Sequence, residues 1–177
     1  MSEVLEPGDT AIDATMGNGY DTLFLASRVG NFGKVYAIDI QPIALENTRQ
    51  RLFSHGMEKH VSLVLGSHEN LSDLVPIRVI GHTKTIMFNL GYLPRGDKKT
   101  KTSVITTLAA LKTAVKIIAV SGRITIVAYT GHCGGKEEAE AVKAFGKSLS
   151  NNRYQFSMEI PKTRGRNVPW LMVIEKK

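Results

Sequence analysis

A glycine-containing turn near the start of the chain constrains the fold more than any other feature. The run Asp13–Asp21 reads DATMGNGYD; it follows a short apolar segment, 10–12, and precedes a helix-like stretch, 23–26. A strand that ends in an acidic residue and passes through a glycine turn into a helix is typical of α/β proteins that bind a nucleoside cofactor. Glycines let the backbone approach the ligand, and the first helical turn offers unpaired N–H groups. The run therefore predicts a nucleoside site at this strand end.

The composition is that of an ordinary globular protein. The 177 residues are 42% hydrophobic and 22% charged, and this length is enough for one hydrophobic core, so we expect a single domain over residues 1–177. No apolar stretch approaches the roughly 20 residues that span a bilayer. The opening MSEVLEP lacks the basic-then-apolar pattern of a signal peptide. One cysteine, Cys133, excludes an intrachain disulfide and fits a reducing, cytoplasmic compartment.

Apolar strand-like segments and helix-like segments alternate along the chain, which predicts a parallel sheet. Strands are expected at 10–14, 34–40, 61–65, 84–89, 123–129, 154–160 and 170–174. Helices are expected at 20–29, 41–55, 69–74, 101–119 and 136–150. In the helix at 101–119 apolar residues recur every three or four positions, which gives it one buried face. A turn at Ser121-Gly122 is expected to lead into the fifth strand.

The last two expected strands differ in their hydropathy pattern. Apolar and polar residues alternate in 154–160, whereas 170–174 is continuously apolar and therefore typical of a strand covered on both faces. We expect the final strand inside the sheet and the one before it at the edge. The predicted fold is α/β and Rossmann-like: a mostly parallel seven-stranded sheet with an antiparallel C-terminal strand, as in class I methyltransferases.

The glycine pattern separates two classes of cofactor. A dinucleotide site prefers G-x-G-x-x-G, but Thr15-x-Gly17-x-Gly19 has no third glycine at the matching place. Asp13, at the strand end, also suits the positively charged methionine end of S-adenosylmethionine (SAM). The sequence therefore favours SAM, with S-adenosylhomocysteine (SAH) as product, and an NAD-dependent oxidoreductase is the alternative.

The ends of the second and third strands supply further candidates. Asp39 follows Gly19 by 20 residues, where a carboxylate can accept both hydroxyls of a ribose in either cofactor. Ser67 and His68 follow the third strand, where adenine contacts are usual. The candidate cofactor-binding residues are Asp13, Thr15, Met16, Gly17, Asn18, Gly19, Asp21, Asp39, Ile40, Gln41, Ser67, His68 and Asn89.

Two later segments, with the glycine run and Asp39, carry a family resemblance. They are 89–94 (NLGYLP), after the fourth expected strand, and 129–135 (YTGHCGG), after the fifth. Together they make the chain similar to the rRNA methylase family over 7–176. The characterised members of that family are class I, SAM-dependent tRNA methyltransferases. The resemblance implies methylation of the amine of 5-aminomethyl-2-thiouridine at the wobble position.

The resemblance also implies catalytic roles at the fourth and fifth strand ends. Amino-methyltransferases carry Asn/Asp-Pro-Pro-Tyr where this chain has Asn-Leu-Gly-Tyr. The side-chain oxygen of Asn89 and the carbonyl of Leu90 are then candidate acceptors for the amine, and Tyr92 packs on the base. Both prolines are missing, so a rigid loop is not implied. His132 is a candidate for deprotonating the amine or contacting phosphate, whereas an exocyclic amine requires no covalent activation by Cys133.

A net charge of +7, from 23 basic and 16 acidic residues, indicates a polyanionic partner. Under the resemblance this partner is the anticodon loop of tRNA, with an unpaired base in the pocket. The candidate RNA contacts are Arg95, Lys98, Lys99, Arg164, Arg166 and Asn167. Ribosomal RNA and a small amine are the alternative acceptors, and a homodimer would enlarge the surface for an anticodon arm. No group of His, Cys and carboxylates has metal-ligand spacing, so no metal is expected.

Overall fold

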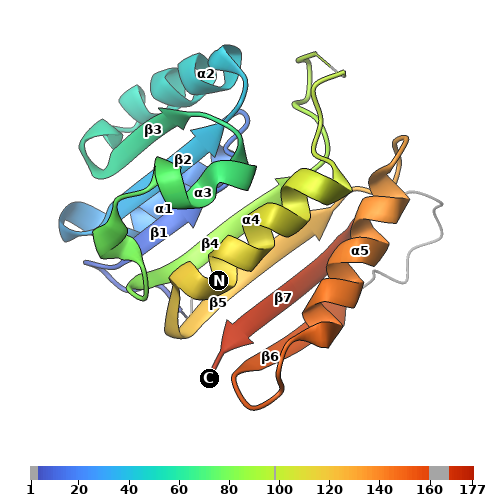
Figure 1. Cartoon of the computed structure of the whole chain (residues 1–177). Helices are drawn as coiled ribbons and strands as arrows, with labels where there is room; N and C mark the ends of the chain where they lie inside the picture. The colour runs from blue at the N-terminus through green and yellow to red at the C-terminus, as the bar shows by residue number, and fades with distance from the viewer. Residues whose placement is uncertain (1–3, 98, 160–167) are drawn as a thin grey trace.

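The computed structural model describes residues 4–97, 99–159 and 168–177. These residues form a seven-stranded sheet in the order β3-β2-β1-β4-β5-β7-β6 (Figure 1). The strands are β1 (Thr10–Asp13), β2 (Lys34–Asp39), β3 (Val61–Leu65), β4 (Thr83–Leu90), β5 (Ile118–Ala128), β6 (Tyr154–Glu159) and β7 (Trp170–Lys176). The first five strands are parallel, and β7 is antiparallel to both β5 and β6. The predicted mostly parallel sheet with an antiparallel C-terminal strand is confirmed.

Helices pack on both faces of the sheet (Figure 1). One face carries α1 (Tyr20–Val29) and α2 (Pro42–Phe53), and the other carries α3 (Leu71–Leu74), α4 (Val104–Ile117) and α5 (Gly135–Ser148). Successive side chains of a strand point to opposite faces. Accordingly Ala11 of β1 is buried under α1 and α2, whereas Ile12 is buried in the cluster that includes α4 and α5. The short 3-10 helices are η1 (Gly30–Phe32), η2 (Glu58–His60), η3 (His68–Asn70) and η4 (Ile77–Val79).

The order of the last two strands follows their hydropathy patterns. β7 lies between β5 and β6, and β6 forms the edge of the sheet. Met172 and Ile174 of β7 are fully buried, whereas β6 alternates between half-buried and exposed residues. The prediction of an internal final strand is therefore confirmed.

The fifth strand begins earlier than the sequence predicted. The turn expected at Ser121-Gly122 is an irregularity inside β5, because the pairing with β4 jumps from Thr83↔Ile118 to Thr85↔Arg123. Ser121 takes a φ of 60° within it. Ile118, expected on the buried face of the preceding helix, is instead the first residue of β5. That helix, α4, begins at Val104, after a capping box, and not at residue 101. The other described boundaries agree to within about two residues.

In the described part of the chain, no helix combines the length and the apolar composition that crossing a membrane requires.

Gly19 determines how closely α1 and α2 approach each other. It is the N-cap of α1 and has a φ of 79°. A Cβ at this position would lie 2.9 Å from the Cα of Thr48 in α2 and 2.8 Å from the Thr48 side chain. Because one of these contacts is with backbone, a side-chain rotation cannot relieve it. Gly19 is thus needed both for the left-handed turn and for the packing of the two helices.

Replacing Gly19 with Ala should destabilise the protein more than replacing Gly56 with Ala. Both glycines have a positive φ, 79° and 66°, so each Ala costs roughly 1–2 kcal/mol of left-handed strain. A Cβ at Gly56 meets nothing within 4 Å, whereas the overlap with Thr48 adds about 1–3 kcal/mol. Urea denaturation of the two variants measures the difference. Equal losses would mean that α2 can shift away without cost.

Candidate functional site

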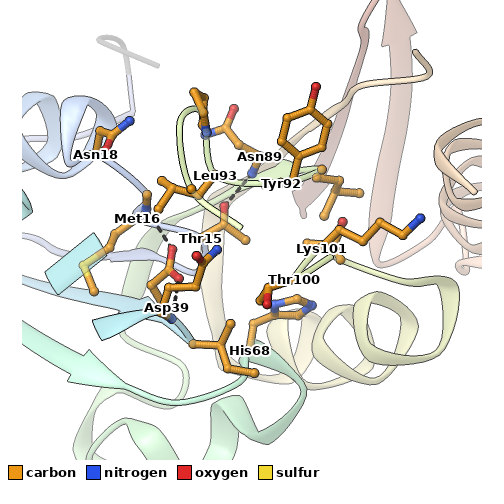
Figure 2. Close-up of a pocket in the computed structure, with 18 of the residues that line it drawn as sticks. Thr15, Met16, Asn18, Asp39, His68, Asn89, Tyr92, Leu93, Thr100 and Lys101 are labelled. Atoms are coloured by element: carbon orange, nitrogen blue, oxygen red, sulfur yellow. Dashed lines mark hydrogen bonds between the residues drawn. The ribbon is translucent and has the colours of Figure 1, made fainter. Parts of the chain in front are cut away.

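A cavity of about 1500 Å³ opens where β1, β2, β3, β4 and β5 end (Figure 2). Open α/β sheets bind ligands outside the carboxyl ends of their strands, at the point where the strand order reverses, which here is between β1 and β4. Most of the predicted cofactor-binding residues line this cavity: Thr15, Met16, Gly17, Asn18, Asp21, Asp39, Ile40, Gln41, Ser67, His68 and Asn89.

Asp13 and Gly19 do not line the cavity. Asp13 is fully buried below the glycine loop, where it accepts hydrogen bonds from the Thr22 hydroxyl at 2.6 Å and from the Thr15 N–H at 3.3 Å. No surface of its carboxylate is left for a ligand. Asp13 therefore joins the first turn of α1 to the end of β1, and it shapes the loop from beneath. Gly19, similarly, makes room for α2.

Burial raises the pKa of Asp13 from its ordinary value of 3.8 to about 7, and the nearby carboxylates of Asp21 and Asp39 add to this rise. The hydrogen bonds from Thr22 and Thr15 oppose it. The folded protein therefore keeps a proton on Asp13 at pH values at which the unfolded chain has lost it.

Asp39 joins the end of β2 to the glycine loop. One carboxylate oxygen accepts the N–H of Gly17 at 3.0 Å, and the other accepts the N–H of Gln41 at 2.9 Å. Burial raises the pKa of Asp39, and these backbone N–H groups oppose the rise. The neighbouring Ile40 side chain is 55% exposed. A carboxylate beside an exposed apolar side chain suits the ribose and base of a nucleoside.

Thr15 and Asp21 hold Asn89, the last polar residue of β4. The Thr15 hydroxyl accepts the backbone N–H of Asn89 at 2.6 Å (Figure 2), and the carboxylate of Asp21 accepts the side-chain N–H of Asn89 at 2.5 Å. Because the amide nitrogen is committed to Asp21, the amide oxygen is the atom that can accept a hydrogen bond from a ligand.

A hairpin follows β4 and forms one side of the cavity. Tyr92 pairs with Lys101 in an antiparallel bridge, and the Thr102 N–H donates to the Gly91 carbonyl at 2.9 Å. The Lys101 ammonium donates to the carbonyl of Cys133 at 2.6 Å. The sequence implied no rigidity here, because both prolines of the related motif are missing. Strand pairing and the contact with the β5–α5 loop constrain the segment instead.

A buried carboxylate anchors the base of this hairpin. Glu138 of α5 is 1% exposed and accepts the hydroxyls of Thr102 at 2.8 Å and Thr107 at 2.6 Å. It thus joins the hairpin, α4 and α5. Sequence reasoning missed Glu138 because an acidic residue in the first turn of a helix is usually exposed, and its partners lie 36 and 31 residues away.

His132 lies against the hairpin. Its ring meets Tyr92 edge-on, with centroids 5.7 Å apart. Its Nδ1 is 3.1 Å from the Cys133 carbonyl oxygen, whereas its Nε2 is buried and has no hydrogen-bond partner among the described residues. A Cβ on Gly135 would overlap the backbone carbonyl oxygen of Tyr129 and would also lie 2.9 Å from this Nε2, so a glycine is required there. The structure brings together at the cavity all four candidate catalytic residues: Asn89, Leu90, Tyr92 and His132.

His68 presents a second buried ring to the cavity. Its Nε2 has no hydrogen-bond partner in the described ranges, and burial lowers the pKa of the imidazole. The ring is therefore neutral at neutral pH, although its Nε2 is itself buried.

Two of the candidate RNA contacts, Arg95 and Lys99, lie in the hairpin and line the cavity. The others, Lys98, Arg164, Arg166 and Asn167, fall outside the described residues.

The cavity also has lining residues that were not among the predicted site residues, including Tyr20, Asn47, Arg51, Thr100, Lys101 and Tyr129. Within 4–97, 99–159 and 168–177, no group of three or more His, Cys, Asp and Glu is placed to hold a metal ion.

A family model described as "Putative rRNA methylase" matches residues 35–175. The chain belongs to this rRNA methylase family. The curated "tRNA (mnm(5)s(2)U34)-methyltransferase, chloroplastic" of Arabidopsis thaliana is 43% identical over 155 residues, which cover 83% of this chain and 56% of that protein. The chain thus spans little more than half the length of this relative.

Two solved structures are similar to nearly the whole chain. The crystal structure of a "putative rRNA-methylase" from Clostridium thermocellum has a TM-score of 0.93 and 37% identity, and covers 99% of this chain and 92% of that one. The structure of a "putative methyltransferase" from Streptococcus mutans, in complex with SAH, has a TM-score of 0.87 and 35% identity. It covers 99% of this chain and 93% of that one. The predicted family and its class I fold are confirmed.

Replacing Asp13 with Asn should flatten the pH dependence of stability. The pKa of Asp13 is 3.8 in the unfolded chain and about 7 in the folded protein. Between these two pH values the unfolded chain releases the proton more readily, so the free energy of unfolding falls as the pH rises. The Asn variant lacks this loss, so its free energy of unfolding should rise relative to wild type across that window. Urea denaturation at several pH values between 4 and 8 measures it. Parallel pH profiles would contradict a raised pKa.

Replacing Thr102 with Val should loosen the hairpin while leaving the rest of the fold intact. The lost hydrogen bond to Glu138 costs about 1 kcal/mol, which corresponds to roughly fivefold faster amide exchange in 91–102. Thr83→Val is the matched control, because it removes a buried hydroxyl bond, to the Val79 carbonyl, at the opposite end of β4. Equal exchange of 91–102 in both variants would show that Glu138 does not anchor the hairpin.

Proposed function

We propose that this chain is a SAM-dependent tRNA methyltransferase. It transfers a methyl group to the amine of 5-aminomethyl-uridine, or its 2-thio form, at the wobble position. The name of the Arabidopsis relative supports the acceptor, and the SAH in the Streptococcus mutans structure supports the cofactor. The observation that carries the proposal is the amide of Asn89, which Asp21 orients so that its oxygen can meet an amine.

The residues around the cavity fit SAM. The carboxylate of Asp39 suits the ribose hydroxyls, and the exposed Ile40 and the cavity-lining ring of His68 suit an adenine. The first N–H groups of α1, after Gly19, suit the carboxylate of the methionine moiety. When bound, SAM supplies a methyl group made electrophilic by its sulfonium.

The residues of this chain would position the acceptor, because an in-line displacement with a good leaving group depends mainly on alignment. The amine must be neutral, and the Asn89 side-chain oxygen and the Leu90 carbonyl accept its N–H groups and direct its lone pair. Tyr92 packs on the uracil ring. As the new N–C bond forms and the C–S bond breaks, the amine gains a positive charge. It then gives up a proton, for which His132 Nε2 is our candidate acceptor.

The partner of this reaction is the anticodon loop of a tRNA. The net charge of +7 favours a polyanion, and Arg95 and Lys99 line the cavity. Lys98, Arg164, Arg166 and Asn167 remain predicted RNA contacts.

We further propose that the domain works as a homodimer, which would enlarge the surface for the anticodon arm. A monomer mass by light scattering would contradict this. The lone, unpaired Cys133 supports a reducing, cytoplasmic location.

Ribosomal RNA is the second candidate acceptor. The description of the family model favours it, and so does a relative named "Ribosomal RNA small subunit methyltransferase H", which is 31% identical over 87 residues. The same assay separates the two acceptors.

The purified protein should transfer label from SAM into tRNA that carries the free 5-aminomethyl group, and nucleoside analysis should find the methylated amine. Asn89→Ala should lower kcat by about 100-fold, because a positioned hydrogen-bonding group at the reacting centre is lost. Asn152→Ala, in an exposed turn before β6, is the matched control.

Three results would contradict the proposal in different ways. Label in ribosomal RNA alone would replace the acceptor by the second candidate. Unchanged kcat in Asn89→Ala would remove Asn89 from the acceptor site. Thermal stabilisation by NADH and not by SAH would overturn the cofactor.

A further inference from the structure

An exposed aromatic side chain at the cavity has no role in the function proposed so far. Tyr20, the first residue of α1, is 67% exposed and lines the cavity. The guanidinium of Arg51, from α2, lies 3.6 Å from the centroid of its ring. Arg51 lines the cavity as well. The two side chains thus present an aromatic ring and a planar cation to the same space.

The pair is held in place before any ligand arrives. The Nε of Arg51 donates to the backbone carbonyl of Asn18 at 2.7 Å, and the side-chain carbonyl of Asn18 accepts from the amide of Asn47 at 2.9 Å. Arg51 is therefore attached to the glycine loop, and Tyr20 packs on a fixed guanidinium. Because Tyr20 and Arg51 are already ordered, a ligand that stacks on them costs little side-chain entropy.

The pair lies at the glycine-loop side of the cavity. Tyr20 adjoins Asp21, whose carboxylate holds the amide of Asn89, so it is close to the candidate acceptor site. Asn18, to which Arg51 is bonded, lies on the far side of the close-up from Lys101 (Figure 2). Tyr20 and Tyr92 thus line the same cavity as Asn89, the centre of the candidate acceptor site.

We propose that Tyr20 and Arg51 form a stacking subsite for an unpaired nucleobase next to the base that is methylated. Unpaired bases of RNA loops stack on aromatic rings and on guanidinium planes, and an arginine also attracts the adjoining phosphate. Two separate stacking positions in one cavity, at Tyr20 and at Tyr92, fit a splayed single-stranded loop, and they exceed what a free nucleoside or a small amine needs. This inference rests on the proposed function, because it requires a nucleic-acid acceptor.

The test compares Tyr20→Leu with Tyr20→Phe, which keeps the ring. Phe53→Leu is the matched control, because Phe53 is a 74% exposed aromatic residue of α2 that does not line the cavity. We expect Tyr20→Leu to raise the KM for an anticodon stem-loop by roughly 5- to 100-fold, the range for losing one stacked base. Tyr20→Phe and Phe53→Leu should keep the wild-type KM, and all three variants should keep the SAH affinity measured by calorimetry.

Several outcomes would overturn the subsite. An equal loss of SAH affinity in Tyr20→Leu would assign the pair to the cofactor. An unchanged KM for the stem-loop would assign it to helix packing. A failure of the proposed function is distinguishable, since it would appear as no transfer by the wild-type protein. In that case the stacking is still tested by fluorescence. The wild-type protein should quench a 2-aminopurine placed in a single-stranded RNA loop, and Tyr20→Leu should not.

Discussion

The hydrogen bond from the Asn89 N–H to the Thr15 hydroxyl fixes the spacing on which the rest of the site depends. β1 and β4 are neighbours, but the chain leaves them toward helices on opposite faces of the sheet, so their loops diverge. The Thr15 hydroxyl joins the two loops at 2.6 Å, and Asp39 joins the first of them to β2. The proposed cofactor side and the proposed acceptor side of the cavity are thereby held at a fixed separation. Small errors in such alignment cost large factors in rate.

Three carboxylates lie near these loops, and each has a different environment. Asp13 is buried and titrates near neutral pH, so it contributes shape more than charge. Asp39 is half-buried and is held by backbone N–H groups. Asp21 faces the cavity and orients an amide. These different environments explain how three acidic residues from β1, α1 and β2 can lie near one another despite their mutual repulsion.

The sequence predicted the places of the last two strands, and most of the residues it proposed for the cofactor lie at the cavity, because these features depend on local patterns. Glycine spacing located the first loop, and continuous apolar character placed β7 inside the sheet. What it missed arises from contacts between distant segments. Asp13 has the sequence position of a ligand contact, yet its burial and its bond to Thr22 become visible only when α1 is in place. Glu138 and the pair of Tyr20 and Arg51 likewise depend on how separate helices meet, which no local period encodes.

The insertion of β7 between β5 and β6 has a consequence for biosynthesis. β6 leaves the ribosome before β7, yet its neighbour in the sheet is β7, so it has no partner when it first emerges. β5 also keeps an open edge until β7 arrives, and this edge belongs to a strand with a fully buried apolar core. The part of the sheet built from β1 to β5 can assemble first, whereas β6 can join it only once β7 has been synthesised. In that interval the nascent chain exposes an edge to which chaperones, or another copy, can bind.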